Sequence, residues 1–259
     1  MARTALIAFL LLTPSCRAFG FLFPAPTPMQ VLRYPASAAS RAECLIILLP
    51  GRGDDPDSFE KEGFIEELRA RHIPADVEVA AATFGYYAKW TFPERFGNDV
   101  VEPAVKQGYQ RIWMAGVSMG GFGAADFATH HGDLFDGVLL IAPYLGEGAV
   151  LDEIEQQGGL RKWTPGSATG AQDERALWLW LKTAAEAATG PAGRPEQPEL
   201  YLGFGEDDRM HRTHQLLASA LPPARLYPNP GGHDWPVWRR SWAAFLDGSD
   251  FARRCGAGH

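Results

Sequence analysis

The sequence is poor in cysteine and in clustered positive charge, and each shortage excludes a class of protein. Three cysteines among 259 residues are too few for a small disulfide-based scaffold. The 24 Lys and Arg residues stand against 31 Asp and Glu, for a formal net charge of -7. Without a long basic cluster, the chain offers no surface that attracts phosphate backbones, so no nucleic-acid partner is expected. The hydrophobic share of 46% instead indicates a globular protein with a substantial core.

The N-terminal segment also lacks an apolar run of membrane-spanning length. The run from Ala5 to Leu12 is too short for a stable anchor. It follows Arg3 and precedes small residues, which is the layout of a secretory signal peptide. Residues 1–18 are therefore predicted to be removed and the protein to be exported. One alternative is that Cys16 is lipidated, as in a bacterial lipoprotein, which would tether the protein to a membrane. Another is that the apolar N-terminus is not cleaved and the protein stays in the cytoplasm.

Cleavage after Ala18 would leave only Cys44 and Cys255. An oxidising compartment would allow these two thiols to pair. However, Cys44 begins a predicted strand and Cys255 lies four residues from the end of the chain. We therefore expect two unrelated thiols.

Short apolar runs alternate with segments of helical periodicity, which predicts an α/β fold. Continuous apolar runs are typical of parallel strands buried on both faces. Repeated βα units imply right-handed crossovers and helices on both sides of a mostly parallel sheet. The expected strands span residues 44–50, 77–84, 111–117, 137–143, 199–205 and 225–229. The expected helices span residues 59–71, 99–107, 119–130, 211–220 and 235–246.

One segment, residues 144–198, breaks this alternation because it contains no strong strand pattern. Two helices are expected in it, near 150–157 and 173–187. We interpret the segment as a helical insertion over the carboxyl edge of the sheet, where ligands bind in open α/β folds. The remainder is predicted to be one domain covering residues 28–250.

The motif Gly116-Val117-Ser118-Met119-Gly120 follows a predicted strand and opens a predicted helix. This context is typical of a nucleophile elbow, a tight turn that projects a serine above the sheet. The backbone N–H of Met119 would then begin the helix, where unpaired amides favour a developing oxyanion. The alternative is a purely structural glycine-rich turn.

A serine hydroxyl needs a base to remove its proton and a carboxylate to orient that base. His233 follows two glycines near the last predicted strand and is the candidate base. Asp207 and Asp208 follow the preceding strand and are the candidate acids. Serine, acid and histidine therefore occur in the order of the α/β-hydrolase fold.

From about Cys44 to Leu246 the chain resembles an α/β-hydrolase of the serine-esterase kind. Such proteins often carry G-x-x-D after the acid-bearing strand, and Gly205 to Asp208 match it, so the resemblance selects Asp208 as the acid. In that family a turn after an early strand supplies a second oxyanion amide. Here Pro50 stands where histidine is common, and the resemblance places the donor at the backbone N–H of Arg52.

The expected activity is hydrolysis of a carboxylic ester of a small molecule through an acyl-enzyme, without cofactor or metal. The same residues would also serve a thioesterase, an acyltransferase or a peptidase. A different class of protein with this fold would be an inactive binding protein. Tyr86, Tyr87 and Trp90 are candidate substrate contacts, although packing beneath the insertion is an equal alternative.

Overall fold

The computed structural model describes residues 23–37, 40–166, 174–189 and 197–256. The predicted signal peptide and Cys16 lie outside these residues. Within the described ranges, none of the helices combines the length and the apolar character that crossing a membrane requires.

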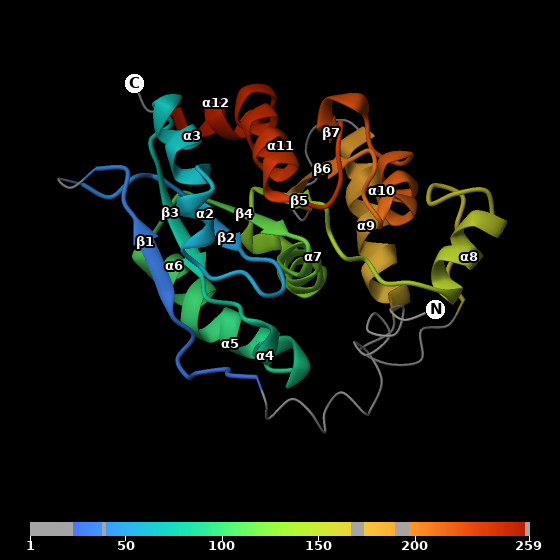
Figure 1. The fold of residues 1–259 in the computed structure, drawn as a ribbon, viewed down its shortest axis with the longest axis horizontal. Helices are drawn as coiled ribbons and strands as arrows, with labels where there is room; N and C mark the ends of the chain where they lie inside the picture. Colours follow the sequence, from blue (N-terminus) through green and yellow to red (C-terminus); the bar gives the residue numbers. More distant parts are fainter. Residues whose placement is uncertain (1–22, 38–39, 167–173, 190–196, 257–259) are drawn as a thin grey trace, which may run out of the picture.

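Seven strands form one sheet in the order β1-β3-β2-β4-β5-β6-β7, shown in Figure 1. All neighbouring strands are parallel except β1 and β3, which are antiparallel. The strands are β1 (Val31–Tyr34), β2 (Cys44–Leu49), β3 (Ala75–Ala80), β4 (Arg111–Val117), β5 (Gly137–Ile141), β6 (Glu199–Gly205) and β7 (Leu226–Asn229). The predicted α/β-hydrolase architecture is confirmed by this sheet and by the structural similarities described below.

Helices cover both faces of the sheet. One face carries α4 (Phe84–Ala88), α5 (Phe92–Phe96), η2 (Gly97–Val101), α6 (Glu102–Gln107), α7 (Met119–His131), α9 (Glu174–Thr189) and α10 (His211–Ala218). The other face carries α2 (Ser58–Lys61), α3 (Phe64–Ala70), α11 (Trp235–Gly248) and α12 (Asp250–Gly256). The two short 3-10 helices are η3 (Gly132–Leu134) and η4 (Pro223–Arg225).

Strand β2 shows why the parallel strands are apolar along their whole length. Alternate side chains of a strand point to opposite faces of the sheet. Leu45, Ile47 and Leu49 belong to the core beneath α7, whereas Ile46 and Leu48 belong to the core beneath α11. Because helices cover both faces, every residue of β2 is buried.

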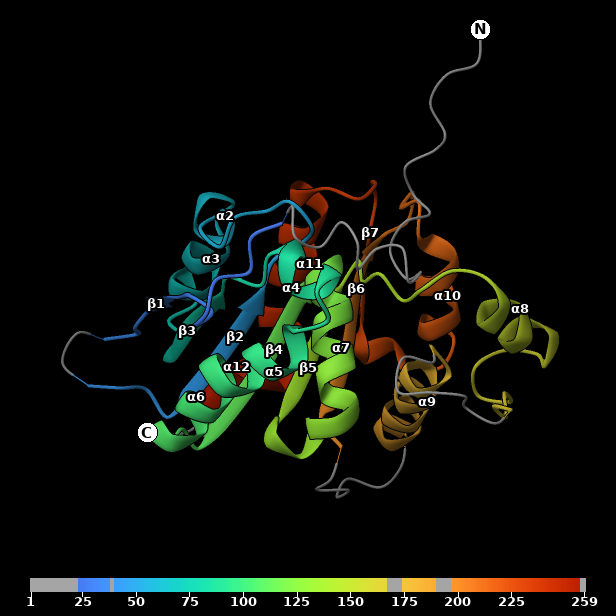
Figure 2. The same ribbon diagram turned by 90° about the horizontal axis from the view of Figure 1, so that it is seen from below.

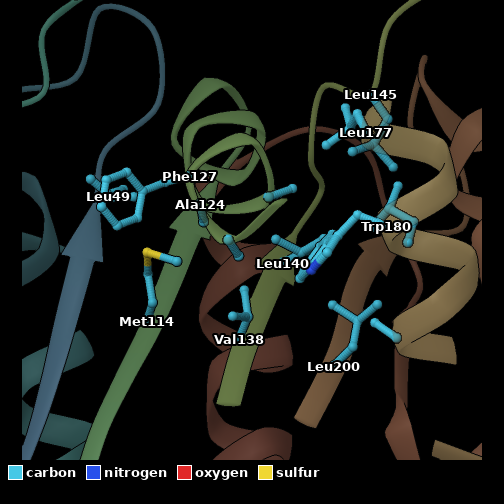
Figure 3. Close-up of a cluster of buried hydrophobic side chains, with 14 of the residues drawn as sticks. Leu49, Met114, Ala124, Phe127, Val138, Leu140, Leu145, Leu177, Trp180 and Leu200 are labelled. Carbon is cyan, nitrogen blue, oxygen red and sulfur yellow. The ribbon is translucent and has the colours of Figure 1, made fainter. Parts of the chain in front are cut away.

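The predicted insertion contains α8 (Ala149–Gln156) and α9. Helix α9 packs against α7 and β6 as part of a helical layer. The apolar face of α9 supplies Trp178 and Leu181, both fully buried. Figure 3 shows Leu177 of α9 beside Leu145 and Trp180 of α9 near Leu140 of the sheet. Burial of this apolar face holds α9 on the sheet.

The two remaining cysteines are bonded, which corrects the expectation of unrelated thiols. Cys44 and Cys255 form a disulfide with a Cα–Cα distance of 5.5 Å. Helix α12, which the sequence pattern did not predict, carries Cys255 back to the first residue of β2. Disulfides persist mainly in oxidising compartments, and export of the protein stays a prediction.

Replacing Cys255 with alanine is expected to lower the free energy of unfolding by about 2–5 kcal/mol. The bond closes a loop over a sequence separation of 211 residues, and its loss frees the unfolded chain. Urea titration with and without a reductant measures the effect. Reductant should lower the midpoint of the unmodified protein and leave the variant unchanged. Equal midpoints in all four samples would contradict a stabilising bond.

Candidate active site

Ser118 occupies the sharp turn between β4 and α7. Its φ of 53° and ψ of -112° lie outside the regions that L-residues normally adopt. The turn is held by hydrogen bonds from the Ser118 N–H to the Ile141 carbonyl, 2.9 Å, and from the Tyr144 N–H to the Ser118 carbonyl, 3.0 Å. The predicted turn is therefore present, with a strained backbone fixed by the residues after β5.

Gly120 allows this turn to approach the end of β2. A Cβ atom at this position would lie only 2.1 Å from the carbonyl oxygen of Leu49, so no other residue fits without a shift of backbone. The close contact also brings the following loop to Ser118. A Cβ placed on Gly51 would be 3.5 Å from the Ser118 Cβ.

His233 links Ser118 to Asp208 through hydrogen bonds. The Ser118 Oγ lies 2.9 Å from His233 Nε2, and His233 Nδ1 lies 2.7 Å from Asp208 Oδ2. A carboxylate oxygen accepts, so Nδ1 carries the proton and Nε2 is left to accept from the serine hydroxyl. The three side chains that the sequence predicted to cooperate are thus brought together from three separate loops.

Gly205 explains how the acid and histidine loops meet. A Cβ atom there would lie 2.4 Å from the carbonyl oxygens of both Gly231 and Gly232. The Asp207 N–H donates to the Gly231 carbonyl, 2.9 Å, while the Asp207 side chain stays exposed. The second aspartate, Asp208, is therefore the one directed at His233.

The Asp208 carboxylate is held as an anion in a buried position. Burial alone would raise its pKa, but hydrogen bonds from His233 and from the Met210 N–H, 2.9 Å, outweigh that cost. The pKa of Asp208 is consequently below its ordinary value. A permanently ionised carboxylate is suited to orienting a histidine and stabilising its protonated form.

An open cleft of about 770 Å³ lies over Ser118 and His233. Its size is that of sites for small molecules. The lining includes Arg52 and Met119, the two residues whose backbone amides were predicted to bind an oxyanion. It also includes residues that the sequence did not single out: Gly51, Asp54, Tyr144, Glu147, Arg209, Met210, Asp234, Trp235 and Trp238.

The predicted substrate contacts Tyr86, Tyr87 and Trp90 do not line this cleft. Tyr86 is fully buried, and its hydroxyl donates to the Pro26 carbonyl, 2.5 Å. Tyr87 stacks on Phe92 with ring centroids 4.6 Å apart. These tyrosines belong to the core because the segment forms α4 and α5 instead of a loop, and their partners Pro26 and Phe92 lie outside the insertion.

His214 is a fully buried histidine on α10. Its Nε2 lies 3.0 Å from the Pro143 carbonyl and donates to it. Burial lowers the pKa of His214 to about 4, although the neighbouring Asp208 carboxylate acts in the opposite direction. The ring is therefore neutral and fixes the backbone beside the Ser118 turn.

Among the described residues, no group of three His, Cys, Asp or Glu side chains is arranged to hold a metal.

A protein-family model described as "Putative esterase" matches residues 55–247 of the chain, which is most of its length. The chain belongs to this esterase family. As predicted, the protein is a carboxylic ester hydrolase. The matched region of the esterase contains Ser118, Asp208 and His233.

Several solved structures have the same fold as this esterase. An S-formylglutathione hydrolase from Staphylococcus aureus is 18% identical with a TM-score of 0.55, covering 85% of this chain and 94% of the other. Est1E from Butyrivibrio proteoclasticus, solved with ferulic acid, is 17% identical with a TM-score of 0.54, covering 85% and 95%. An S-formylglutathione hydrolase from Agrobacterium tumefaciens is 15% identical with a TM-score of 0.54, covering 88% and 90%. No sequence among the curated proteins matches the chain.

Proposed function

We propose that the esterase hydrolyses its ester through a covalent acyl-enzyme on Ser118. The observation that carries this proposal is the continuous chain of hydrogen bonds from Asp208 through His233 to Ser118 at the base of an open cleft. A serine so connected has a base to take its proton, and the base has a carboxylate to hold its tautomer.

In the first half-reaction, Ser118 Oγ attacks the acyl carbon while its proton moves to His233 Nε2. The resulting oxyanion is held by the N–H groups of Met119 and Arg52; the first opens α7 and has no acceptor within the helix. His233 then returns the proton to the departing alkoxide, which leaves as the alcohol. Throughout, Asp208 stabilises the imidazolium and remains ionised.

In the second half-reaction, water replaces the alcohol. His233 removes a proton from water, the hydroxide attacks the acyl carbon, and Ser118 leaves with that proton as the carboxylic acid is released. The cleft is open to solvent, so water can reach the acyl carbon. A thioester would pass through the same steps with a thiol as leaving group. Two of the structural neighbours are named for hydrolysis of S-formylglutathione, so a thioester belongs in the test set.

A fluorophosphonate is expected to label Ser118 stoichiometrically, because this reagent traps a serine whose base is in place. Peptide mass spectrometry locates the label, and p-nitrophenyl esters of several chain lengths and one acyl thioester define the activity. Heat-denatured protein is the control and should remain unlabelled. Labelling elsewhere would contradict the assignment of Ser118, and turnover of none of these substrates with no labelling would indicate an inactive binding protein.

A further inference from the structure

The carboxylate of Asp54 lies in the cleft beside the serine. A Cβ built on Gly51 would be 2.6 Å from Asp54 Oδ2 and 3.5 Å from the Ser118 Cβ. The carboxylate and the serine therefore face each other across a single glycine. The steps proposed above give Asp54 no role.

This carboxylate is half-buried without a cationic partner. The indole N–H of Trp235 donates to Asp54 Oδ1 at 3.3 Å, and both residues line the cleft. Burial raises the pKa of Asp54 above its ordinary value and outweighs the hydrogen bonds from the Trp235 indole and the Gly51 backbone, which lower it; the nearby carboxylates of Glu62 and Asp55 raise it further. In the described part of the chain, no Lys or Arg pairs with Asp54. A half-buried carboxylate without a cationic partner attracts a positive charge supplied by a ligand.

Aromatic rings extend this site toward the position of the leaving group. His233 must deliver its proton to the departing alcohol, so the alcohol lies next to the imidazole. Trp238 packs edge-on against His233 with ring centroids 4.9 Å apart, and Trp235 lies 5.0 Å from Trp238. Indole faces attract ammonium groups, most strongly quaternary ones. Trp238 is buried, so the partly exposed ring of Trp235, which holds Asp54, is the one available on the alcohol side of the cleft.

Two guanidinium groups, on Arg52 and Arg209, also line the cleft. Both residues are exposed, so water and salt screen their charges. Asp54 is instead partly shielded and is fixed by its hydrogen bond from Trp235. Because the charge of Asp54 is screened less than the charges of the two arginines, Asp54 determines whether the cleft prefers a cationic or an anionic alcohol.

We propose that this esterase prefers esters whose alcohol carries an ammonium or quaternary ammonium group, bound between Asp54 and the partly exposed ring of Trp235. The proposal rests on the proposed function, since it places the alcohol by the role of His233. No additional reactant is involved; the ammonium group is recognised and leaves unchanged with the alcohol.

The test compares butyrate esters of choline and of 3,3-dimethylbutanol, its uncharged carbon isostere, at mildly alkaline pH. The ratio of kcat/KM values, charged over neutral, is expected to be about ten or more in the unmodified protein. Asp54→Asn keeps an acceptor for Trp235 and removes the charge, so the ratio should fall about tenfold. Asp55→Asn is the matched control, because it removes the adjacent exposed charge outside the cleft and should leave the ratio unchanged.

The outcomes separate the preference from the activity itself. Hydrolysis of both esters with a ratio near one, or an equal fall in both variants, overturns the ammonium preference and leaves the esterase mechanism standing. Preference for an ester whose alcohol carries a carboxylate overturns the ammonium preference and indicates that Arg52 and Arg209 select the alcohol. If no ester or thioester is hydrolysed and the fluorophosphonate does not label the protein, both the ammonium preference and the esterase mechanism are overturned. If Asp54→Asn does not fold, competitive inhibition of the unmodified protein decides: choline should bind about tenfold tighter than 3,3-dimethylbutanol, and equal binding overturns the proposal.

Discussion

Replacing Ser118 with alanine is expected to lower kcat for an activated ester by about 10⁶-fold, the loss found when the nucleophile of a comparable triad is removed. The alanine keeps the Cβ and the strained turn but supplies no oxygen for the acyl bond. The residual rate would come from binding and from the amides of Met119 and Arg52. Stopped assays with p-nitrophenyl butyrate, normalised to folded protein by circular dichroism, measure the effect.

Ser219→Ala is the control for this experiment. Ser219 lies at the exposed end of α10, where its hydroxyl donates to the Leu216 carbonyl. Its loss should leave kcat unchanged. A Ser118→Ala protein that is folded and retains more than a small fraction of the original kcat would rule out the acyl-enzyme on this residue.

Replacing Asp208 with asparagine is expected to lower kcat by about 10⁴-fold. The asparagine amide can donate to His233 Nδ1, which then places the ring proton on Nε2 and prevents it from accepting the Ser118 proton. The buried site would also lose the anion that stabilises the imidazolium. The change preserves shape, so the free energy of unfolding measured in urea separates this effect from misfolding.

Asp207→Asn is the matched variant, because it makes the same chemical change one residue away. The Asp207 side chain is exposed, and the position contributes to the site through its backbone N–H, which asparagine retains. We expect its kcat to stay within a few-fold of the original. Activity lost in Asp207→Asn and kept in Asp208→Asn would reverse the assignment of the two aspartates.

Most of the sheet could be predicted because its parallel strands are apolar on both faces. Strand β1 could not, since VLRY is short, half-buried and paired only at the antiparallel edge of the sheet. The expected helix over residues 59–71 is divided into α2 and α3 at Gly63. The aromatic segment after β3 forms α4 and α5, which are five residues each and too short to show a clear period.

Part of the candidate site could likewise be predicted from the sequence, and part could not. Ser118 and His233 were predictable because the tight turn and the glycine loop leave local patterns in the sequence. Asp54 and Trp235 are 181 positions apart, and only folding of the two loops brings the carboxylate to the indole N–H. Similarly, the pairing of Cys44 with Cys255 depends on a helix, α12, whose seven residues show no distinctive pattern.

The position of the disulfide has a practical consequence. Cys44 is the first residue of β2, so the bond holds the C-terminal helix at the amino ends of the strands, as Figure 2 shows. The cleft lies over the carboxyl ends, on the opposite edge of the sheet. An affinity tag, a fluorescent label or a link to a solid support at the C-terminus would therefore leave the entrance for substrate unobstructed.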